Sequence, residues 1–333
     1  MSNVLKTAVE SANSIVIIQA ENPDGDSLGS SLALEEILGD LGKKMHLYCH
    51  VDMPKYLRHM DGWARVESDF PFKADLAIIV DTLSDTLLSK ALATPGVRHF
   101  LETHPVIAID HHASVEDTLS FPHDVITDDT AVATGETITR LAEEAGWKIN
   151  PMAASSLYSS IMSDSLGLTT DGTTAESIHT IARLVEYGAV PKDIEAARRE
   201  LMKKSPEILE YKGKLIQRIE YLCDGQLALV HIPWEDIEAY SDQYNPSVLV
   251  LDEMRLVTGV ELAVALKTYP DGKITGKLRA NQPIADKVGG YFGGGGHPYA
   301  SGFRAFDTYE NIRRELVTAT LKSLKDLDSD KAS

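Results

Sequence analysis

The chain has 333 residues, enough for two domains that each bury a core of their own. Its formal net charge of −18 excludes a surface-wide positive field that would attract long duplex nucleic acid. Two cysteines, Cys49 and Cys223, lie far apart and have no metal-binding spacing, which is typical of a reducing compartment. Because the N-terminus lacks a signal-like pattern and no apolar run could span a bilayer, we expect a cytoplasmic protein without a membrane partner.

Short apolar runs in the first half are rich in β-branched residues and predict strands of a sheet that is covered on both faces. The runs are residues 14–18, 76–80 and 106–109, and residues 44–49 predict a further strand. Helical periodicity is found over residues 27–41, 134–145, 152–163 and 177–188. Strands that alternate with helices predict an α/β fold with a doubly wound parallel sheet in this half.

The second half has a different pattern. Residues 205–222 have the spacing of one long helix. After it, strands are expected at 226–232, 247–251, 259–268 and 273–279, with a hairpin turn at residues 269–272. We therefore expect a first domain over residues 1–190, a helical linker over 191–223, a smaller α/β domain with a mixed sheet over 224–328, and a disordered tail over 329–333.

Polar side chains follow each of three apolar strands, and they are the most informative feature of the sequence. They are Asp24 and Asp26 after the first strand, Asp81 after the second, and Asp110, His111 and His112 after the third. Because open α/β sheets collect their functional groups at the carboxyl ends of the strands, we expect these side chains to meet. Carboxylate and imidazole groups are ligands of divalent metal ions. For Asp24 and Asp26, helix capping and turn formation are the alternative.

One further carboxylate, Asp164, ends an otherwise apolar helical pattern. By itself it is a weak signal, but as a fourth acidic ligand it would complete a site for two metal ions.

A glycine run, Gly293-Gly294-Gly295-Gly296, precedes His297 in the second half. Four glycines let the backbone approach a ligand and direct its N–H groups toward an anion, whereas the alternative is a flexible linker. By period two, Arg279 shares a strand face with Lys273, Thr275 and Lys277. Arg279 is a candidate for bidentate phosphate contact, and a solvated face explains Lys273 and Lys277.

In this order, the motifs resemble those of the DHH-type phosphoesterases, over nearly the whole chain and specifically the group with a DHHA1 domain. Within the family the chain looks most similar to the short oligoribonucleases that are also 3′-phosphoadenosine 5′-phosphate phosphatases. The resemblance implies a metal-dependent phosphoesterase whose cleft between two domains takes short single-stranded RNA or DNA oligonucleotides, linear dinucleotides or a nucleotide bisphosphate. It leaves open whether the chain forms a homodimer.

The resemblance also implies a role for each motif residue. Two Mn²⁺ ions are expected, with Mg²⁺ as the alternative. Asp24 and Asp81 would hold the first ion, and the second would be held by Asp26, Asp81, His111 and Asp164. The catalytic residues would be Asp81, Asp110, His111 and His112, with Asp110 orienting the histidines. The substrate would be bound by His112, Arg279, Gly294, Gly295, Gly296 and His297.

One position departs from the family pattern. Where family members have a histidine, four residues before Asp24, this chain has Ala20. Alanine cannot coordinate a metal, so the first metal site is short of one ligand and is weakened. Three alternatives are open. Gln19 or Glu21 supplies an oxygen ligand in place of the histidine, water fills the position, or the site is mononuclear or inactive. The corresponding alternatives for function are a weakened nucleotide-binding protein, a single-strand exonuclease and a pyrophosphatase on the same catalytic domain.

Overall fold

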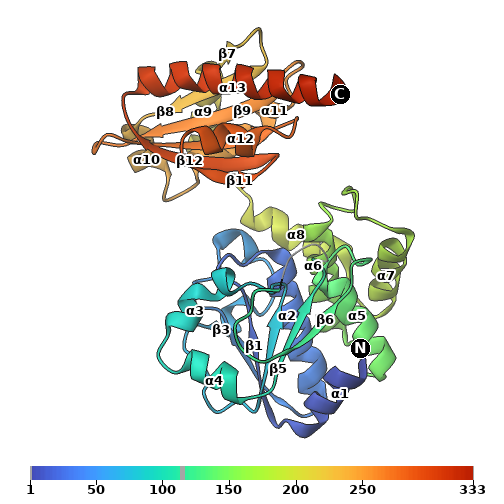
Figure 1. The fold of residues 1–333 in the computed structure, drawn as a ribbon. Coiled ribbons are helices and arrows are strands. Elements are labelled where there is room, and N and C mark those ends of the chain that lie inside the picture. Colours follow the sequence, from blue (N-terminus) through green and yellow to red (C-terminus); the bar gives the residue numbers. More distant parts are fainter. Residues whose placement is uncertain (1, 113–116, 333) are drawn as a thin grey trace. The chain divides into compact units, whose positions relative to one another are not determined.

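The computed structural model describes residues 2–112 and 117–332 and divides into two compact units, Met1–Lys203 and Lys204–Ser333 (Figure 1). The division falls within the region expected to be a linker. Helix α8 (Pro191–Leu201) belongs to the first unit, and α9 (Pro206–Gln217) belongs to the second. No helix within the described residues is long and apolar enough to cross a membrane.

The first unit is built on a six-stranded parallel sheet, as predicted. In spatial order its strands are β3 (Val66–Glu67), β2 (Lys44–Tyr48), β1 (Ser14–Ile18), β4 (Leu76–Val80), β5 (Val106–Asp110) and β6 (Asp124–Thr127). The direction of winding reverses between β1 and β4. In such sheets, the crevice at the carboxyl ends beside the reversal is where ligands bind.

Helices cover both faces of this sheet. Successive side chains of a strand point to opposite faces, and because the central strands are apolar along their whole length, both faces are apolar. Ile15 and Ile17 pack against one layer of helices, α1 (Ser2–Ser11), α2 (Gly25–Asp40), α5 (Thr134–Ala145) and α6 (Pro151–Asp164). Val16 and Ile18 pack against the other layer, α3 (Ser89–Ala93) and α4 (Val97–Thr103). Helix α7 (Ala175–Glu186) contacts α5 and α6. The doubly wound prediction is therefore confirmed.

The second unit has a mixed six-stranded sheet, which confirms the second half of the fold prediction. In spatial order its strands are β11 (Gly295–His297), β12 (Ala300–Phe306), β10 (Lys273–Ala280), β9 (Leu262–Thr268), β8 (Leu227–Ile232) and β7 (Glu220–Leu222). Only β8 and β9 pair in parallel among these described strands. One face packs against α12 (Ala285–Tyr291) and α13 (Tyr309–Ala332), and the other against α9, α10 (Trp234–Tyr240) and α11 (Leu251–Arg255).

Three local predictions were wrong. The helix expected over 205–222 ends at Gln217, and Glu220–Leu222 form strand β7 instead. The positive φ angles of Cys223, Asp224 and Gly225 turn the chain so that β7 pairs with β8. The strand expected over 247–251 is a 3-10 helix (Pro246–Leu249) followed by α11, and the side chain of Asn245 caps it by accepting from the Ser247 N–H. The tail expected to be disordered from residue 329 is helical as far as Ala332, and Ser333 lies outside the described residues.

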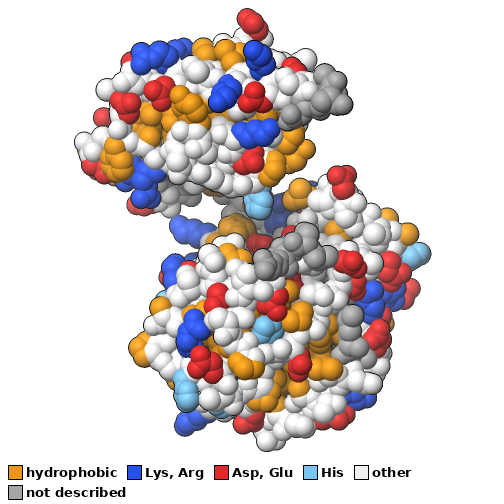
Figure 2. Space-filling model, viewed as in Figure 1, with side chains coloured by type: hydrophobic (Ala, Val, Ile, Leu, Met, Phe, Trp, Pro, Cys, Tyr) orange, Lys and Arg blue, Asp and Glu red, His pale blue; other side chains and the backbone are white. Residues whose placement is uncertain are grey.

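Charged side chains of both signs are intermixed on the visible face of each unit (Figure 2). This agrees with the absence of a surface-wide positive field that was inferred from the net charge.

Candidate metal centre

Asp24 forms the N-terminal cap of α2. Its Oδ1 accepts hydrogen bonds from the N–H groups of Asp26 and Ser27, each at 3.0 Å. The capping alternative from the sequence is therefore true of Asp24. Both capping hydrogen bonds go to Oδ1 and none to Oδ2. The cap also places Asp26 in the first turn of the helix. Burial, together with the nearby Asp26 carboxylate, raises the pKa of Asp24.

Asp26 is 1% exposed, and three helices converge on its carboxylate. It accepts hydrogen bonds from the N–H of Thr134 at 2.7 Å, the N–H of Gly135 at 3.2 Å and the hydroxyls of Ser30 and Ser160 at 3.1 and 2.5 Å. The sequence reasoning missed all four partners. The spacing of Ser30, four residues after Asp26 on a helix, was a usable signal. The others are more than a hundred residues away and had none.

Asp81 has a backbone φ of 61°, an unusual conformation for a residue with a side chain. The conformation is held because the Asp81 N–H donates to the Ile109 carbonyl at 2.9 Å and the Thr134 hydroxyl donates to Asp81 Oδ1 at 3.2 Å. Burial and the surrounding carboxylates, Asp26 foremost, raise the pKa of Asp81 well above its usual value. A strained residue with a high carboxylate density around it is typical of a functional site.

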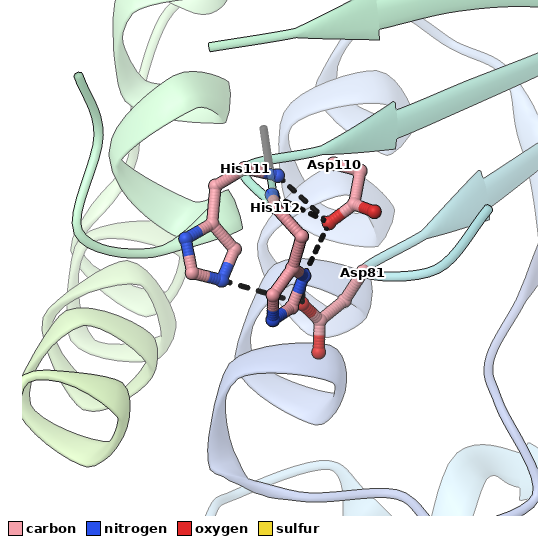
Figure 3. Close-up of side chains that lie close together, drawn as sticks. All are labelled: Asp81, Asp110, His111 and His112. Atoms are coloured by element: carbon pink, nitrogen blue, oxygen red, sulfur yellow. Dashed lines mark hydrogen bonds and ion pairs between the residues drawn. The ribbon is translucent and has the colours of Figure 1, made fainter. Parts of the chain in front are cut away.

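Asp110 and His112 form a hydrogen-bonded pair at the end of β5 (Figure 3). His112 Nδ1 lies 2.7 Å from Asp110 Oδ1, which also accepts from the N–H groups of His111 and His112. Burial is the largest single effect and opposes ionisation of Asp110. The hydrogen bond and charge of His112, together with the N–H groups of His111 and His112, outweigh it, so the pKa of Asp110 is lowered. The same hydrogen bond raises the pKa of His112. Asp110 therefore fixes the orientation of the His112 ring and favours its protonated form.

His111 directs Nε2 toward three carboxylates. This buried nitrogen has no hydrogen-bond partner within the described residues. It lies 3.3 Å from Asp164 Oδ2, 3.7 Å from Asp26 Oδ2 and 3.8 Å from Asp81 Oδ1. Burial and the Asp26 carboxylate raise the pKa of Asp164 to about 6. A lone imidazole nitrogen among carboxylates that repel one another is the arrangement that a divalent cation satisfies.

Two groups of side chains could therefore hold a metal ion. One consists of Asp81, Asp110, His111 and His112, and the other of Asp26, His111 and Asp164. Within each group the ligand atoms lie within 4.8 Å of one another. Oxygen and imidazole donors suit Mn²⁺ or Mg²⁺. Of the predicted metal ligands, Asp24 alone belongs to neither group.

The residues around Ala20 distinguish between the open replacements for the missing histidine. The Glu21 carboxylate accepts from the Ser89 hydroxyl at 2.7 Å and the Lys90 N–H at 2.5 Å, and it pairs with Lys90 Nζ at 3.7 Å. Glu21 is thus engaged by α3 and lies in neither metal group. Gln19 is buried, and both polar atoms of its amide lack a hydrogen-bond partner within the described residues. Gln19 is therefore the better candidate of the two.

Apart from His112, the predicted substrate-binding residues lie in the second unit. Ala300 of β12 pairs with Arg279 on one side and with His297 on the other, which brings these two residues to the same row of the sheet. The glycine run is not a flexible linker, because Gly295 and Gly296 belong to β11. A Cβ on Gly294 would lie 2.1 Å from the Gly302 carbonyl oxygen, so only glycine allows this approach.

Comparison with known proteins identifies the first unit. Residues 14–161 match the family model described as "DHH family, N-terminal domain". The bifunctional oligoribonuclease and PAP phosphatase NrnA of Bacillus subtilis is 22% identical over 324 residues, which cover 96% of this chain and 98% of that protein. The protein of the same name from Thermus thermophilus is 29% identical over 332 residues, 96% of this chain and 94% of that protein.

A solved structure shares the fold of the whole chain. The crystal structure of an exopolyphosphatase-related protein from Bacteroides fragilis has a TM-score of 0.80 and 23% sequence identity, and covers 98% of this chain and 95% of that one. Together with the motif order and the geometry of the acidic cluster, the family match shows that the first unit carries the N-terminal domain of the DHH family over residues 14–161.

Proposed function

We propose that this protein is a metal-dependent phosphoesterase that releases mononucleotides from short oligoribonucleotides and linear dinucleotides, and that also acts on 3′-phosphoadenosine 5′-phosphate. The observation that carries the proposal is His111 Nε2, unpartnered within the described residues and facing the carboxylates of Asp26, Asp81 and Asp164. The two NrnA relatives, which match along nearly their whole length, support the choice of substrate.

The proposed metal ligands are those predicted from the sequence, and all of them except Asp24 belong to the two metal groups. Asp24 and Asp81 would hold one Mn²⁺, with Mg²⁺ as the alternative, and Asp26, Asp81, His111 and Asp164 would hold the second. When bound, two such ions activate water and stabilise the attacking and leaving oxygens of an in-line displacement. The hydrogen bonds from Thr134, Gly135, Ser30 and Ser160 hold Asp26 in place for this task.

Cationic groups must contact the phosphate, because the acidic cluster alone would repel it. His112 is 46% exposed in its side chain, and its hydrogen bond to Asp110 favours the charged imidazolium. It can therefore donate a hydrogen bond to a phosphate oxygen. In the second unit, Arg279, His297 and the backbone of Gly294, Gly295 and Gly296 are proposed to bind the phosphate and the nucleotide end.

Hydrolysis of a dinucleotide in the presence of Mn²⁺ tests the proposal. Mononucleotide release should fall by at least about 100-fold in Asp81→Ala, because a shared ligand is lost. Asp61→Ala, which removes an exposed carboxylate in the same unit, is the matched control. Wild-type protein that binds the dinucleotide but turns it over no faster than Asp81→Ala would favour the weakened nucleotide-binding protein instead.

Two further measurements separate the remaining alternatives. Faster turnover of pyrophosphate or of long single-stranded DNA than of the dinucleotide would refute the proposed substrate. Arg279→Ala should raise KM for the dinucleotide while leaving the bound Mn²⁺ unchanged, since Arg279 lies outside both metal groups. A loss of metal in that variant would show that Arg279 has a different role.

The proposed location is the cytoplasm, and a homodimer is a further proposal. Cys49 and Cys223 are both free thiols, as expected of a reducing compartment. Analytical ultracentrifugation measures the oligomeric state directly.

A further inference from the structure

One face of the second sheet is only partly covered by helices. The apolar core on the side of α9, α10 and α11 contains side chains of β8 and β9 but, within the described residues, none of β10 or β12. Along β10, the buried residues Ile274, Leu278 and Ala280 belong to the opposite core. The alternate residues of β10, among them Lys277 and Arg279, therefore face the less covered side.

Cations gather on this face because the strand register aligns them. Thr275 of β10 pairs with Lys267 of β9 on one side and with Arg304 of β12 on the other. In the next row, Lys277 pairs with the small residues Ala265 and Gly302. Directly paired residues point to the same face of a sheet, so Lys267, Lys277 and Arg304 surround one area.

The space between them is a pocket of about 560 Å³. Lys267, Lys277, Arg304, Asn245, Tyr269 and Gly294 contribute to its lining. Small side chains at its floor and the glycine run at its margin leave room for a ligand of nucleotide size. Arg279 lies two residues beyond Lys277 on the same strand face, so the pocket is continuous with the proposed phosphate-binding row.

These cations lack acidic partners. None of Lys267, Lys277, Arg279 and Arg304 forms an ion pair in the part of the chain that the structure describes, although the chain has a net charge of −18. Partial burial and the charge of Lys277 lower the pKa of Lys267. Partial burial and the charge of Arg279 lower the pKa of Lys277, although the charge of Asp252 acts in the opposite direction. Lys267 Nζ donates to Asn245 Oδ1 at 2.8 Å. Cations held close together without ion-pair partners favour a bound polyanion.

An aromatic side chain completes the pocket. Tyr269 is half-buried, and Lys273 Nζ lies 4.1 Å from the centroid of its ring. Aromatic rings beside a cationic groove are the platforms on which single-stranded nucleic acids stack their bases.

We propose that this pocket binds the second phosphate, and the base beside it, of a single-stranded oligonucleotide whose first phosphate is held by Arg279 and His297. Lys267, Lys277 and Arg304 contact the phosphate, and Tyr269 stacks on the base. The inference rests on the proposed function and adds a subsite to it. A dinucleotide with one phosphodiester does not reach the subsite, so the residues determine selectivity for longer oligonucleotides.

The test is a binding measurement that does not depend on hydrolysis. Fluorescence anisotropy of fluorescein-labelled pentaadenylate is recorded in EDTA with the full chain. The double variant Lys267→Ala/Lys277→Ala should raise Kd about tenfold or more, because two charge-assisted phosphate contacts are lost. The slope of log Kd against log salt concentration should fall by about 1.4, which is about 0.7 for each lysine on a single strand.

Lys322→Ala/Lys325→Ala is the matched control. It removes the same charge from exposed positions of α13, the helix that packs against the opposite face of the sheet. Arg304→Glu is a second test at an exposed position, where misfolding is not expected. The inference would be overturned if both test variants bound pentaadenylate with the same Kd as the control variant.

A kinetic measurement distinguishes this inference from the proposed function. With Mn²⁺ present, the ratio of kcat/KM for pentaadenylate to kcat/KM for a diadenylate should fall about tenfold in the double variant. An unchanged ratio in a wild-type enzyme that hydrolyses both substrates would refute the subsite alone. Wild-type protein that hydrolyses neither refutes the proposed function, while the anisotropy result still decides the subsite.

Discussion

At the scale of single residues, the acidic cluster combines features that oppose folding unless a cation is bound. Asp26 and Asp81 are buried together, and Asp81 has a strained backbone. Buried carboxylates without a counter-charge cost free energy, and a metal ion that binds only the folded chain offsets this cost. The cluster is therefore expected to be the part of the molecule whose stability depends most on metal and on pH.

Restoring the family histidine should strengthen the first metal site. In Ala20→His, the weaker of two Mn²⁺ binding events should gain at least about tenfold in affinity, since an imidazole ligand is added. Isothermal titration calorimetry measures both events. Ala93→His, an exposed position in the same unit, is the control. If neither stoichiometry nor affinity changes, another group such as Gln19 already fills the position.

The carboxylates of the acidic cluster should make the metal-free protein less stable as the pH rises from about 4 to about 6. The pKa of Asp164 in the folded chain is about 6, against an ordinary value of 3.8. Between these values the folded chain holds a proton that the unfolded chain has released, so stability is present at low pH and is lost as the pH rises. The raised pKa values of Asp24 and Asp81 act in the same direction.

Thermal unfolding in EDTA across this pH range measures the effect. Asp164→Asn should flatten the dependence, because an amide does not titrate. The same dependence of Tm on pH in the metal-free wild type and in Asp164→Asn would contradict the assignment.

At the scale of elements, the cluster depends on the close packing of α2 against α6. A Cβ on Gly29 would lie 2.6 Å from the Ser156 carbonyl oxygen and 2.8 Å from Ser160 Cβ. The absence of a side chain at Gly29 lets the helices approach, and the same approach brings the Ser160 hydroxyl to Asp26. The packing of two helices thus helps to position a metal ligand.

Two glycines of α2 should therefore respond oppositely to substitution by alanine. Gly29→Ala should lower the free energy of unfolding by about 1–3 kcal/mol, because the added methyl group overpacks the contact with α6. Gly39→Ala, where a Cβ would meet nothing within 4 Å, should raise it by about 0.5–1 kcal/mol through helix propensity. Urea denaturation compares them. Equal effects of the two substitutions would show that α2 and α6 can separate without cost.

At the scale of the whole molecule, the two units have separate hydrophobic cores. In the first unit, one apolar layer lies between the sheet and α1, α2, α5 and α6, and the other lies between the sheet and α3 and α4. The second unit likewise has an apolar core on each face of its own sheet. All residues of both metal groups belong to the first unit, and the cationic pocket belongs to the second.

Each unit should therefore fold when it is produced alone. We expect residues 1–203 and 204–333 each to show a cooperative thermal transition by circular dichroism, since each retains its core. Mn²⁺ should stabilise only the first fragment, and pentaadenylate only the second. A fragment 204–333 that lacks a cooperative transition would show that its stability depends on the rest of the chain.

The sequence by itself determined the elements and motifs that depend on local pattern. The strands at residues 14–18 and 76–80 agree with β1 and β4 residue for residue, because buried parallel strands need continuous β-branched runs. The parallel sheet, and with it the meeting of Asp26, Asp81 and His111 at one edge, follows from the alternation of strands and helices.

Only the tertiary structure decided what depends on contacts between distant residues. Local periodicity could not separate a helix from a strand over residues 247–251, since a short apolar run fits both. Thr134 and Ser160 reach Asp26 only through the packing of α5 and α6 on α2. Lys267, Lys277 and Arg304 become one cationic surface only through the register of three strands. Strand register and helix packing depend on the whole core, so they cannot be predicted from any short segment of the sequence.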